Sequence, residues 1–180
     1  MHKKLLESEP YRPSEDTFFL ADYIKNEKGD TALDIGSGSG YLTKLLTESF
    51  SFVVGTDINF QVLKKQSYKT SNLVCCNGAD ALSFKFDLII CNLPYLATDE
   101  IIDIATDGGP EGLVIPTKIL NSARKCVKSG GKILYVTSSL SNYTKLIEIT
   151  ENLGFETSII GKKKLFFEEM IIIEAKKSLS

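Results

Sequence analysis

The 180-residue sequence predicts an α/β fold: a mostly parallel sheet of seven strands with helices on both faces, ending in an antiparallel hairpin. Strand and helix patterns alternate from Thr31 to the end of the chain, which is typical of a parallel sheet with crossover helices. No repeat or low-complexity segment interrupts this alternation. The last two apolar runs are joined by too few residues for a crossover helix, so they must pair antiparallel.

The first half of the chain begins with a helix and then supplies the first three strands. Ser14 is a good N-cap, with Thr17 at the third helical position, and Gly29 is expected to stop this opening helix. Strands are expected over residues 31–35, 51–56 and 72–76, and helical stretches over residues 41–49 and from Asn59 through Ser67.

The second half supplies the remaining strands and two longer helices. Strands are expected over residues 86–91, 132–137, 155–160 and 167–175, and helices over residues 117–127 and 142–152. The pair Gly130-Gly131 is expected to turn the chain into a strand, and Gly154 to end a helix. The basic segment Gly161-Lys162-Lys163-Lys164 is expected to be the exposed turn of the terminal hairpin.

Length and composition suit one compact domain over residues 1–180, with the segment and helix over residues 1–29 packed on it and no separate substrate-reading domain. The formal net charge of -2 and a pI near 5.5 argue against nucleic-acid binding through a basic surface, because that affinity comes largely from Lys and Arg neutralising phosphates. We find no apolar run of about eighteen residues that would span a membrane. We therefore expect a cytoplasmic protein.

The cysteines do not form a metal-binding pattern. Cys75, Cys76, Cys91 and Cys126 contain no C-x-x-C pair, and the only histidine is His2. Each cysteine lies within or beside an apolar segment, so we expect small buried hydrophobic residues in a reducing compartment, and no metal site.

A glycine-rich loop follows the first expected strand, Asp34-Ile35-Gly36-Ser37-Gly38-Ser39-Gly40. Its glycines permit a tight turn and close approach of a ligand to the backbone. A dinucleotide fingerprint would place its third glycine where this chain has Tyr41, whereas Asp34 offers a carboxylate suited to a cationic amino group. NAD is therefore the less suitable cofactor.

Further polar residues follow the next strands at the edge where open α/β sheets bind ligands. Asp57 ends the second strand, the position from which a carboxylate accepts hydrogen bonds from ribose hydroxyls, and Asp80 follows the third strand, within reach of an adenine amino group.

The fourth strand runs into the tetrapeptide Asn92-Leu93-Pro94-Tyr95. The side-chain oxygen of Asn92 and the backbone carbonyl of Leu93 can accept the two N–H bonds of a planar NH2 group, while Pro94 fixes the turn and Tyr95 stacks on the flat group. An amide nitrogen is a poor nucleophile, so positioning it in line with a sulfonium methyl supplies much of the acceleration. The loop and the tetrapeptide together predict an N-methyltransferase that uses S-adenosylmethionine.

The tetrapeptide resembles the Asn-Pro-Pro-Tyr motif of methyltransferases that act on glutamine, adenine and guanine nitrogens. The opening segment Tyr11-Arg12-Pro13-Ser14-Glu15-Asp16-Thr17-Phe18-Phe19-Leu20 is similar to the N-terminal signature of the archaeal and eukaryotic HemK-like branch. Gly108-Gly109-Pro110-Glu111-Gly112 is similar to the glycine motif of that branch. The branch has a Rossmann-like methyltransferase fold and methylates the glutamine of the Gly-Gly-Gln loop in class I translation release factors.

The resemblance implies site residues and a partner. It implies that Asn92 and Tyr95 hold the substrate amide and that S-adenosylmethionine is contacted by Thr17, Asp34, Gly36, Gly38, Gly40, Asp57, Asp80, Ala81 and Asn92. It also implies a small zinc-binding activator protein, which would pair with the edge strand expected over residues 72–76; the same apolar edge could instead be shielded by a neighbouring loop.

Other functions remain open from the residues. Leu93 also matches the Asn-Leu-Pro-Tyr of rRNA adenine dimethyltransferases, so methylation of RNA or DNA adenine is the nearest alternative. Protein lysine is a further alternative substrate. A catalytically silent scaffold that binds the cofactor would not need an intact Asn92 and Tyr95.

Overall fold

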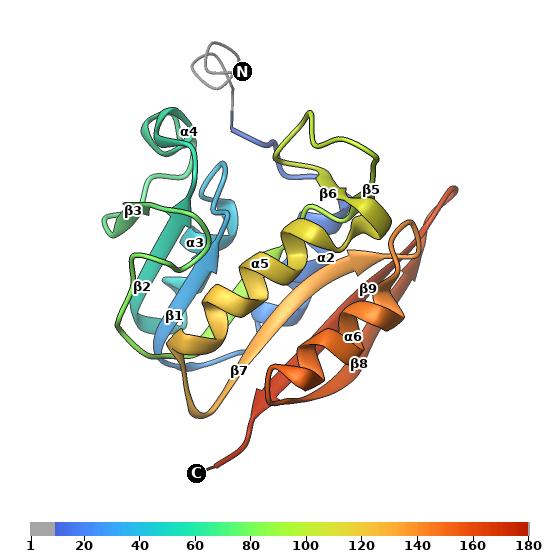
Figure 1. Cartoon of the computed structure of the whole chain (residues 1–180). Helices are drawn as coiled ribbons and strands as arrows, with labels where there is room; N and C mark the ends of the chain where they lie inside the picture. Colours follow the sequence, from blue (N-terminus) through green and yellow to red (C-terminus); the bar gives the residue numbers. More distant parts are fainter. Residues whose placement is uncertain (1–9, 180) are drawn as a thin grey trace.

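The computed structural model describes residues 10–179 and has the expected seven-stranded sheet, in the order β3-β2-β1-β4-β7-β9-β8 (Figure 1). Segments before Pro10, including His2, lie outside the described residues. The strands of this sheet are β1 (Gly29–Ile35), β2 (Phe50–Asp57), β3 (Leu73–Cys75), β4 (Phe86–Asn92), β7 (Val127–Ser138), β8 (Phe155–Lys164) and β9 (Glu169–Lys177). Strands β3, β2, β1, β4 and β7 are parallel, and β9 joins β7 and β8 antiparallel.

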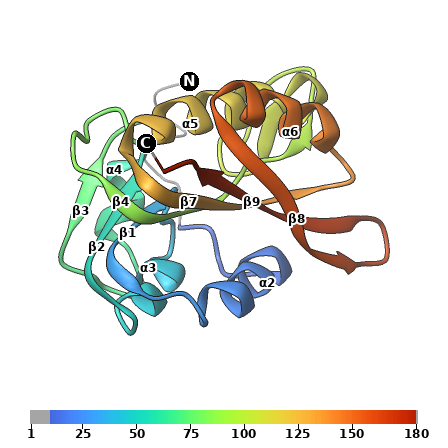
Figure 2. The same ribbon diagram turned by 90° about the horizontal axis from the view of Figure 1, so that it is seen from below.

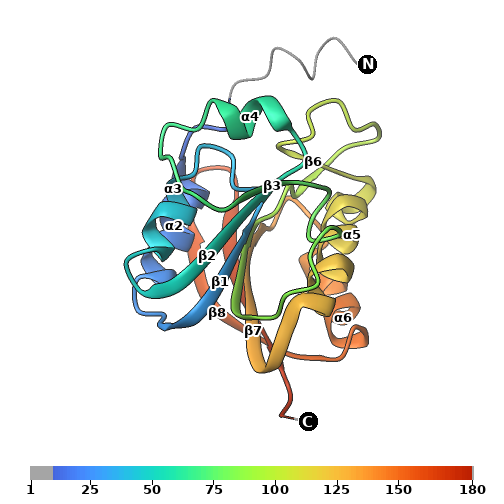
Figure 3. The same cartoon turned by 90° about the vertical axis from the view of Figure 1, so that its left-hand side faces the viewer.

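Helices cover both faces of the sheet, as the alternating pattern predicted. Figure 3 shows α2 (Glu15–Ile24) and α3 (Tyr41–Leu46) on one side, and α5 (Val114–Ala123) and α6 (Tyr143–Asn152) on the other. The short helix α4 (Phe60–Lys64) follows β2. The view from below shows the same three layers (Figure 2).

Each face of the sheet has its own hydrophobic core. Leu33 and Ile89 of the central strands pack with Leu120 of α5 on one face, while Leu88 and Leu20 belong to the opposite core. Because β1 and β4 are buried on both faces, they read as nearly continuous apolar runs in the sequence.

The helix boundaries differ in part from those expected. Ser14 is the N-cap of α2, but its hydroxyl donates to Asp16 rather than capping the helix. The helix ends at Ile24, and Gly29 already belongs to β1, where the ring of Phe50 leaves no room for a side chain. Helix α5 begins before Thr117, and its expected end becomes the 3₁₀ turn η2 (Arg124–Cys126).

The pair Gly130-Gly131 lies inside β7 rather than before it. The pairing of β7 with β4 changes register between Phe86 and Leu88, so these glycines sit in an irregular stretch of a strand that begins at Val127. The predicted turn was wrong, because a glycine pair also occurs inside a strand where its pairing is irregular.

The prediction that the basic segment forms the hairpin turn is also wrong. Gly161-Lys162-Lys163-Lys164 lies within β8 and pairs with residues 169–172 of β9. A side chain at Gly161 would collide with the hydroxyl of Tyr23, so this glycine serves packing. The actual turn contains Phe166 and Phe167, whose side chains are exposed.

Two further strands have no counterpart in the sequence analysis. Strands β5 (Leu96–Ala97) and β6 (Asp107–Gly109) form a small separate sheet after the tetrapeptide at Asn92, followed by the 3₁₀ turn η1 (Pro110–Gly112). Two or three residues per strand are too few to produce a period.

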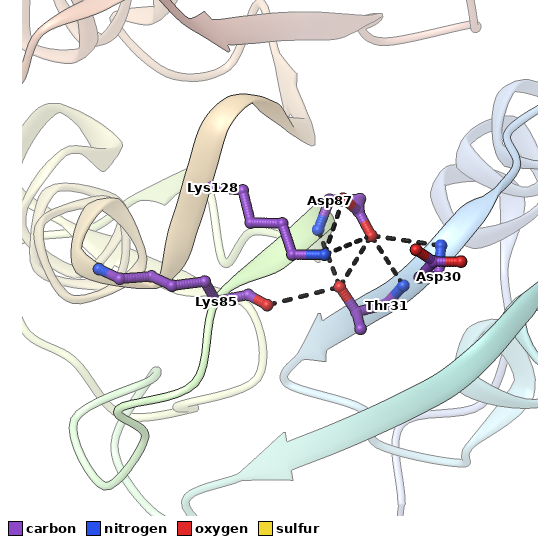
Figure 4. A network of polar contacts seen from close by, with 5 residues as sticks. All are labelled: Asp30, Thr31, Lys85, Asp87 and Lys128. Atoms are coloured by element: carbon purple, nitrogen blue, oxygen red, sulfur yellow. Dashed lines mark hydrogen bonds and ion pairs between the residues drawn. The ribbon is translucent and has the colours of Figure 1, made fainter. Parts of the chain in front are cut away.

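A polar network joins the first residues of β1 and β4, at the end of the sheet away from the loops that follow β1 and β2 (Figure 4). Asp87 of β4 accepts hydrogen bonds from the backbone nitrogens of Asp30 and Thr31 and from the Thr31 hydroxyl, and it pairs with Lys128 at 2.9 Å. Burial raises the pKa of Asp87, but the bonds from Lys128 and Thr31 outweigh it and hold the pKa below its ordinary value.

The cysteines are less uniformly buried than expected. Cys91 and Cys126 are buried, but Cys76 is half-buried and Cys75 is exposed on β3, because an edge strand has one side without a neighbour. Over residues 10–179, no helix is long and apolar enough to cross a membrane.

Candidate active site

The candidate site lies at the end of the sheet that is formed by the carboxyl ends of β1, β2 and β4. The turn of the β8–β9 hairpin reaches the same edge, because Met170 at the start of β9 pairs with Ser138 at the end of β7. Figure 1 shows α4, the β5–β6 sheet and the hairpin tip gathered at this edge.

The glycine loop forms the expected tight turn. Gly36, Gly38 and Gly40 all have positive φ, a conformation that side chains rarely adopt. A side chain at Gly40 would collide with the backbone oxygen of Tyr68, whereas the corresponding space at Gly36 is open. Gly40 therefore has a packing role, and the backbone at Gly36 is accessible to a ligand.

Two carboxylates lie beside this loop. Asp34 is buried and accepts a hydrogen bond of 2.6 Å from the Thr43 hydroxyl; burial, together with the charge of Asp57, raises its pKa to about 7. Asp57 is half-buried and accepts from the backbone nitrogens of Gly38 at 3.1 Å and Asn59 at 2.9 Å. Burial raises the pKa of Asp57, and these two bonds oppose the shift.

Asn92 ends β4, and its side-chain amide has one hydrogen bond in the described part of the chain. Its Nδ2 lies 3.5 Å from Thr17 Oγ1, to which it donates. Its Oδ1 is fully buried and has no hydrogen-bond partner among the described residues. Buried acceptors are normally paired, so this oxygen is available for a donor that the protein itself does not supply.

Asp16 organises the opening segment beside Asn92, a role that the sequence analysis did not predict. Its carboxylate accepts from the hydroxyls of Tyr11 at 3.1 Å, Ser14 at 2.6 Å and Thr17 at 3.2 Å. The backbone nitrogen of Thr17 donates to the same group at 2.6 Å. The hydrogen bonds to Asp16 fix the Thr17 hydroxyl, which in turn accepts a hydrogen bond from the Asn92 amide.

The rest of the tetrapeptide is held by the glycine motif that follows. Leu93 and Pro94 are buried and Tyr95 is half-buried. A side chain at Gly108 would meet the Pro94 oxygen at 2.7 Å, and one at Gly112 would collide with the Tyr95 oxygen. These glycines let the η1 segment pack directly against the tetrapeptide backbone.

Asp80 and Ala81 are exposed in the turn after β3. Asp80 contributes a nearby charge to Cys76 but shares no hydrogen bond with Asp57 or Asn92 in the described network. The structure therefore joins Thr17 to Asn92, and Asp57 to the glycine loop, and leaves Asp80 and Ala81 as separate surface groups.

A hollow of about 690 Å³ lies beside the tetrapeptide, between β5 and η1. All of its charged lining residues are acidic: Asp99, Glu100, Asp107 and Glu111. Of these, Glu111 is paired with Lys145 at 2.9 Å, so the hollow is acidic chiefly through Asp99, Glu100 and Asp107.

Comparison with known proteins shows which family the chain resembles. A family model described as "Methyltransferase small domain" matches residues 14–166. The chain is 31% identical, over 96% of its length and 94% of the relative, to a Methanocaldococcus jannaschii protein provisionally named protein N5-glutamine methyltransferase. It is 24% identical to the human methyltransferase HEMK2, over 95% of this chain and 91% of that protein.

A solved structure is also similar. The E. cuniculi Mtq2–Trm112 complex, described as responsible for methylation of the translation termination factor eRF1, matches with a TM-score of 0.81 and 25% identity. The match covers 93% of this chain and 98% of the other.

Proposed function

This chain belongs to the methyltransferase small domain family, and we propose from that premise that it methylates a glutamine side chain. The methyl donor of the family is S-adenosylmethionine. The proposed acceptor is the amide nitrogen of the glutamine in the Gly-Gly-Gln motif of a class I translation release factor. The named activities of the M. jannaschii and E. cuniculi relatives support this substrate.

The observation that carries the proposal is the unpaired, buried Oδ1 of Asn92. Thr17 binds the Nδ2 of the same amide and thereby directs Oδ1 toward a second partner. An NH2 group is a suitable partner, because it donates two hydrogen bonds and the Leu93 carbonyl can accept the other.

The proposed cofactor residues suit the chemistry of the ligand. S-adenosylmethionine, when bound, supplies a sulfonium methyl group together with a ribose, an adenine and a charged amino-acid end. Gly36 offers accessible backbone and Asp57 a carboxylate for hydroxyl groups. The proposed set is Thr17, Asp34, Gly36, Gly38, Gly40, Asp57, Asp80, Ala81 and Asn92.

The proposed mechanism depends on positioning. Asn92 and Leu93 hold the amide nitrogen, Pro94 fixes the turn and Tyr95 stacks on the planar group. Positive charge develops on the nitrogen as its bond to carbon forms. The two acceptor oxygens stabilise that charge more strongly in the transition state than in the ground state.

The acidic hollow supports a protein substrate over nucleic acid. A polyphosphate strand in this hollow would face Asp99 and Glu100, whereas nucleic-acid affinity comes largely from neutralising phosphates with Lys and Arg. A release factor acts in translation, so we place the proposed reaction in the cytoplasm.

We extend the proposal to a small activator protein at β3. This strand is the edge of the sheet, and the E. cuniculi relative was solved with Trm112. Cys76 N donates to Asp57 of β2, so the N–H of the preceding residue, Cys75, points to the open edge. An added strand would pair with that group.

The activator proposal is tested with two substitutions of the same exposed residue. Cys75→Pro removes the outward N–H, together with the thiol contact to the Ile58 oxygen, whereas Cys75→Ser keeps the N–H and a side-chain donor; an unchanged thermal midpoint shows that both variants fold. Co-expression with a Trm112-like protein should yield a complex with wild type and Cys75→Ser, and at least tenfold less with Cys75→Pro. Equal recovery of all three would refute pairing at this edge.

The function is tested by mass spectrometry of a class I release factor after incubation with S-adenosylmethionine and the activator. We expect one methyl on the Gly-Gly-Gln glutamine with wild type, retained by the exposed control Asn121→Ala and lost in Asn92→Ala. Total RNA and lysine-containing peptides are incubated in parallel. Methyl found only on adenine or only on lysine would replace the glutamine proposal.

A further inference from the structure

The segment that follows α4 lies against the glycine loop. Its Tyr68 nitrogen donates to the Ser39 oxygen at 3.0 Å. The side-chain nitrogen Nε2 of Gln66 donates to the Ser37 hydroxyl oxygen, also at 3.0 Å. A side chain at Gly40 would collide with the Tyr68 oxygen and come within 2.9 Å of the Gln66 Oε1. This segment therefore contacts the loop at three positions.

Gln66 is buried although its neighbours in the chain are not. It is 3% exposed, whereas Lys65 and Ser67 lie at the surface. Burying a long polar side chain costs desolvation and conformational entropy, so an apolar residue of similar size would suit the position better for stability alone. The Oε1 of Gln66 is fully buried and has no hydrogen-bond partner among residues 10–179. The bond to Ser37 is the feature that explains an amide here.

Ser37 is the fixed point of a loop made largely of glycines. Its nitrogen donates to the Thr56 oxygen at 2.8 Å, and its backbone oxygen accepts from the Gly40 nitrogen at 2.7 Å. Gly55 leaves room for the serine, since a side chain at Gly55 would lie 3.2 Å from the Ser37 Cβ. The bond from Gln66 fixes the hydroxyl as well, so Ser37 is held through both its backbone and its side chain.

This anchoring matters because glycines have the largest conformational freedom. Gly36 and Gly38 flank Ser37; the backbone at Gly36 is accessible, and the Gly38 nitrogen donates to Asp57. A loop that is already ordered loses less entropy when a ligand binds to it. A displacement of Ser37 would therefore move both glycines and weaken ligand binding, without removing any group that contacts the ligand.

We propose that Gln66 is a positioning residue, which anchors Ser37 and so keeps the glycine loop ordered for S-adenosylmethionine. This inference rests on the part of the proposed function that assigns the loop to the cofactor. Gln66 acts through Ser37, because its own side chain is buried against the loop.

The test is a double-mutant cycle on Gln66 and Ser37, with affinity for S-adenosylmethionine measured by calorimetry. We expect Gln66→Leu and Ser37→Ala each to weaken binding about tenfold, because each removes the same hydrogen bond and loosens the loop. The double variant should lose less than about twofold more, whereas independent roles would multiply the two losses. Gln61→Leu, the same substitution within α4, is the matched control and should bind like wild type.

A second measurement reports on the loop itself. Hydrogen exchange of the Gly40 N–H, followed by NMR, should be faster in Gln66→Leu by about fivefold or more, because that group donates to Ser37. The Thr31 N–H, bonded to Asp87 at the far end of the sheet, should exchange as in wild type. A residue that only stabilised the whole fold would change both exchange rates together and leave the affinity unchanged.

The outcomes separate this inference from the proposed function. Equal affinity of wild type and Gln66→Leu, multiplicative losses in the cycle, or unchanged exchange at Gly40 would overturn the role of Gln66. If thermal unfolding shows that Gln66→Leu does not fold, Ser37→Ala removes the same bond with a smaller change, and its normal affinity would equally overturn it. If wild type binds S-adenosylmethionine but transfers no methyl to the release factor, the proposed substrate fails, and the binding measurements still decide whether Gln66 orders the loop.

Discussion

The buried carboxyl group of Asp34 makes the stability of this protein depend on pH. Asp34→Asn keeps the shape of the side chain and an oxygen that accepts the Thr43 hydroxyl, but it removes the titratable group. Burial raises the pKa of Asp34 from 3.8 to about 7. The folded protein therefore binds more protons than the unfolded chain between these two values.

The sign and size of the effect follow from linkage. Because the folded state holds the proton more tightly, stability falls as pH rises from about 4 to 7 and then levels off. Relative to acid conditions in which Asp34 is protonated in both states, the free energy of unfolding is lower by about 2 kcal/mol at pH 5 and by about 4 kcal/mol at pH 8. The Asp34→Asn variant would carry no such cost, because its side-chain amide does not titrate.

The assay is urea unfolding of wild type and Asp34→Asn between pH 5 and pH 8. We expect the free energy of unfolding of wild type to fall relative to the variant by about 2–3 kcal/mol across this range. Thr43→Val removes the bond that lowers the pKa of Asp34, so it should move the transition to higher pH.

A difference between the two proteins that stays constant from pH 5 to pH 8 would refute this reasoning. So would a wild type that gains stability relative to the variant as pH rises. Either result would mean that Asp34 is ionised throughout, with its charge balanced inside the fold.

Three further predictions follow from local geometry. Gly40→Ala places a side chain against the Tyr68 oxygen, so it should lower the thermal midpoint and weaken S-adenosylmethionine binding by at least tenfold; normal binding by calorimetry would contradict this. Asp87→Ala leaves the buried Thr31 nitrogen without an acceptor and should cost about 1–3 kcal/mol in urea unfolding, with unchanged cofactor affinity because it lies at the far end of the sheet. Glu111→Gly relieves a positive φ of 57° but also removes the exposed ion pair with Lys145, so it should stabilise the protein by less than about 1 kcal/mol; Glu111→Ala, which loses the same pair and keeps the strain, is the control and should be less stable than Glu111→Gly.

The central part of the fold could be predicted because its signals are local. Strands buried on both faces produce apolar runs such as Phe86–Asn92, and Gly154, with φ of 92°, ends α6 where the sequence indicated. The order of elements then limits the topology, since parallel strands need crossover helices.

The hairpin could not be placed correctly by the same means. Gly161 looks like a turn residue, but its lack of a side chain is required by Tyr23, which lies far away in the chain. The true turn contains Phe166 and Phe167, whose apolar side chains resemble a strand. Composition alone cannot distinguish a glycine that turns the chain from one that makes room for a neighbour.

Some residues of the candidate site could likewise be predicted from the sequence, and others could not. The sequence by itself determined the glycine loop, Asp57 and the tetrapeptide at Asn92, because each follows a strand in a pattern of residue types that a strand end imposes. Only the tertiary structure decided that Asp16 fixes Thr17 beside Asn92. The physical reason is that hydrogen bonds and burial depend on separation in space, and segments from both ends of the chain meet at this edge only after the sheet has formed.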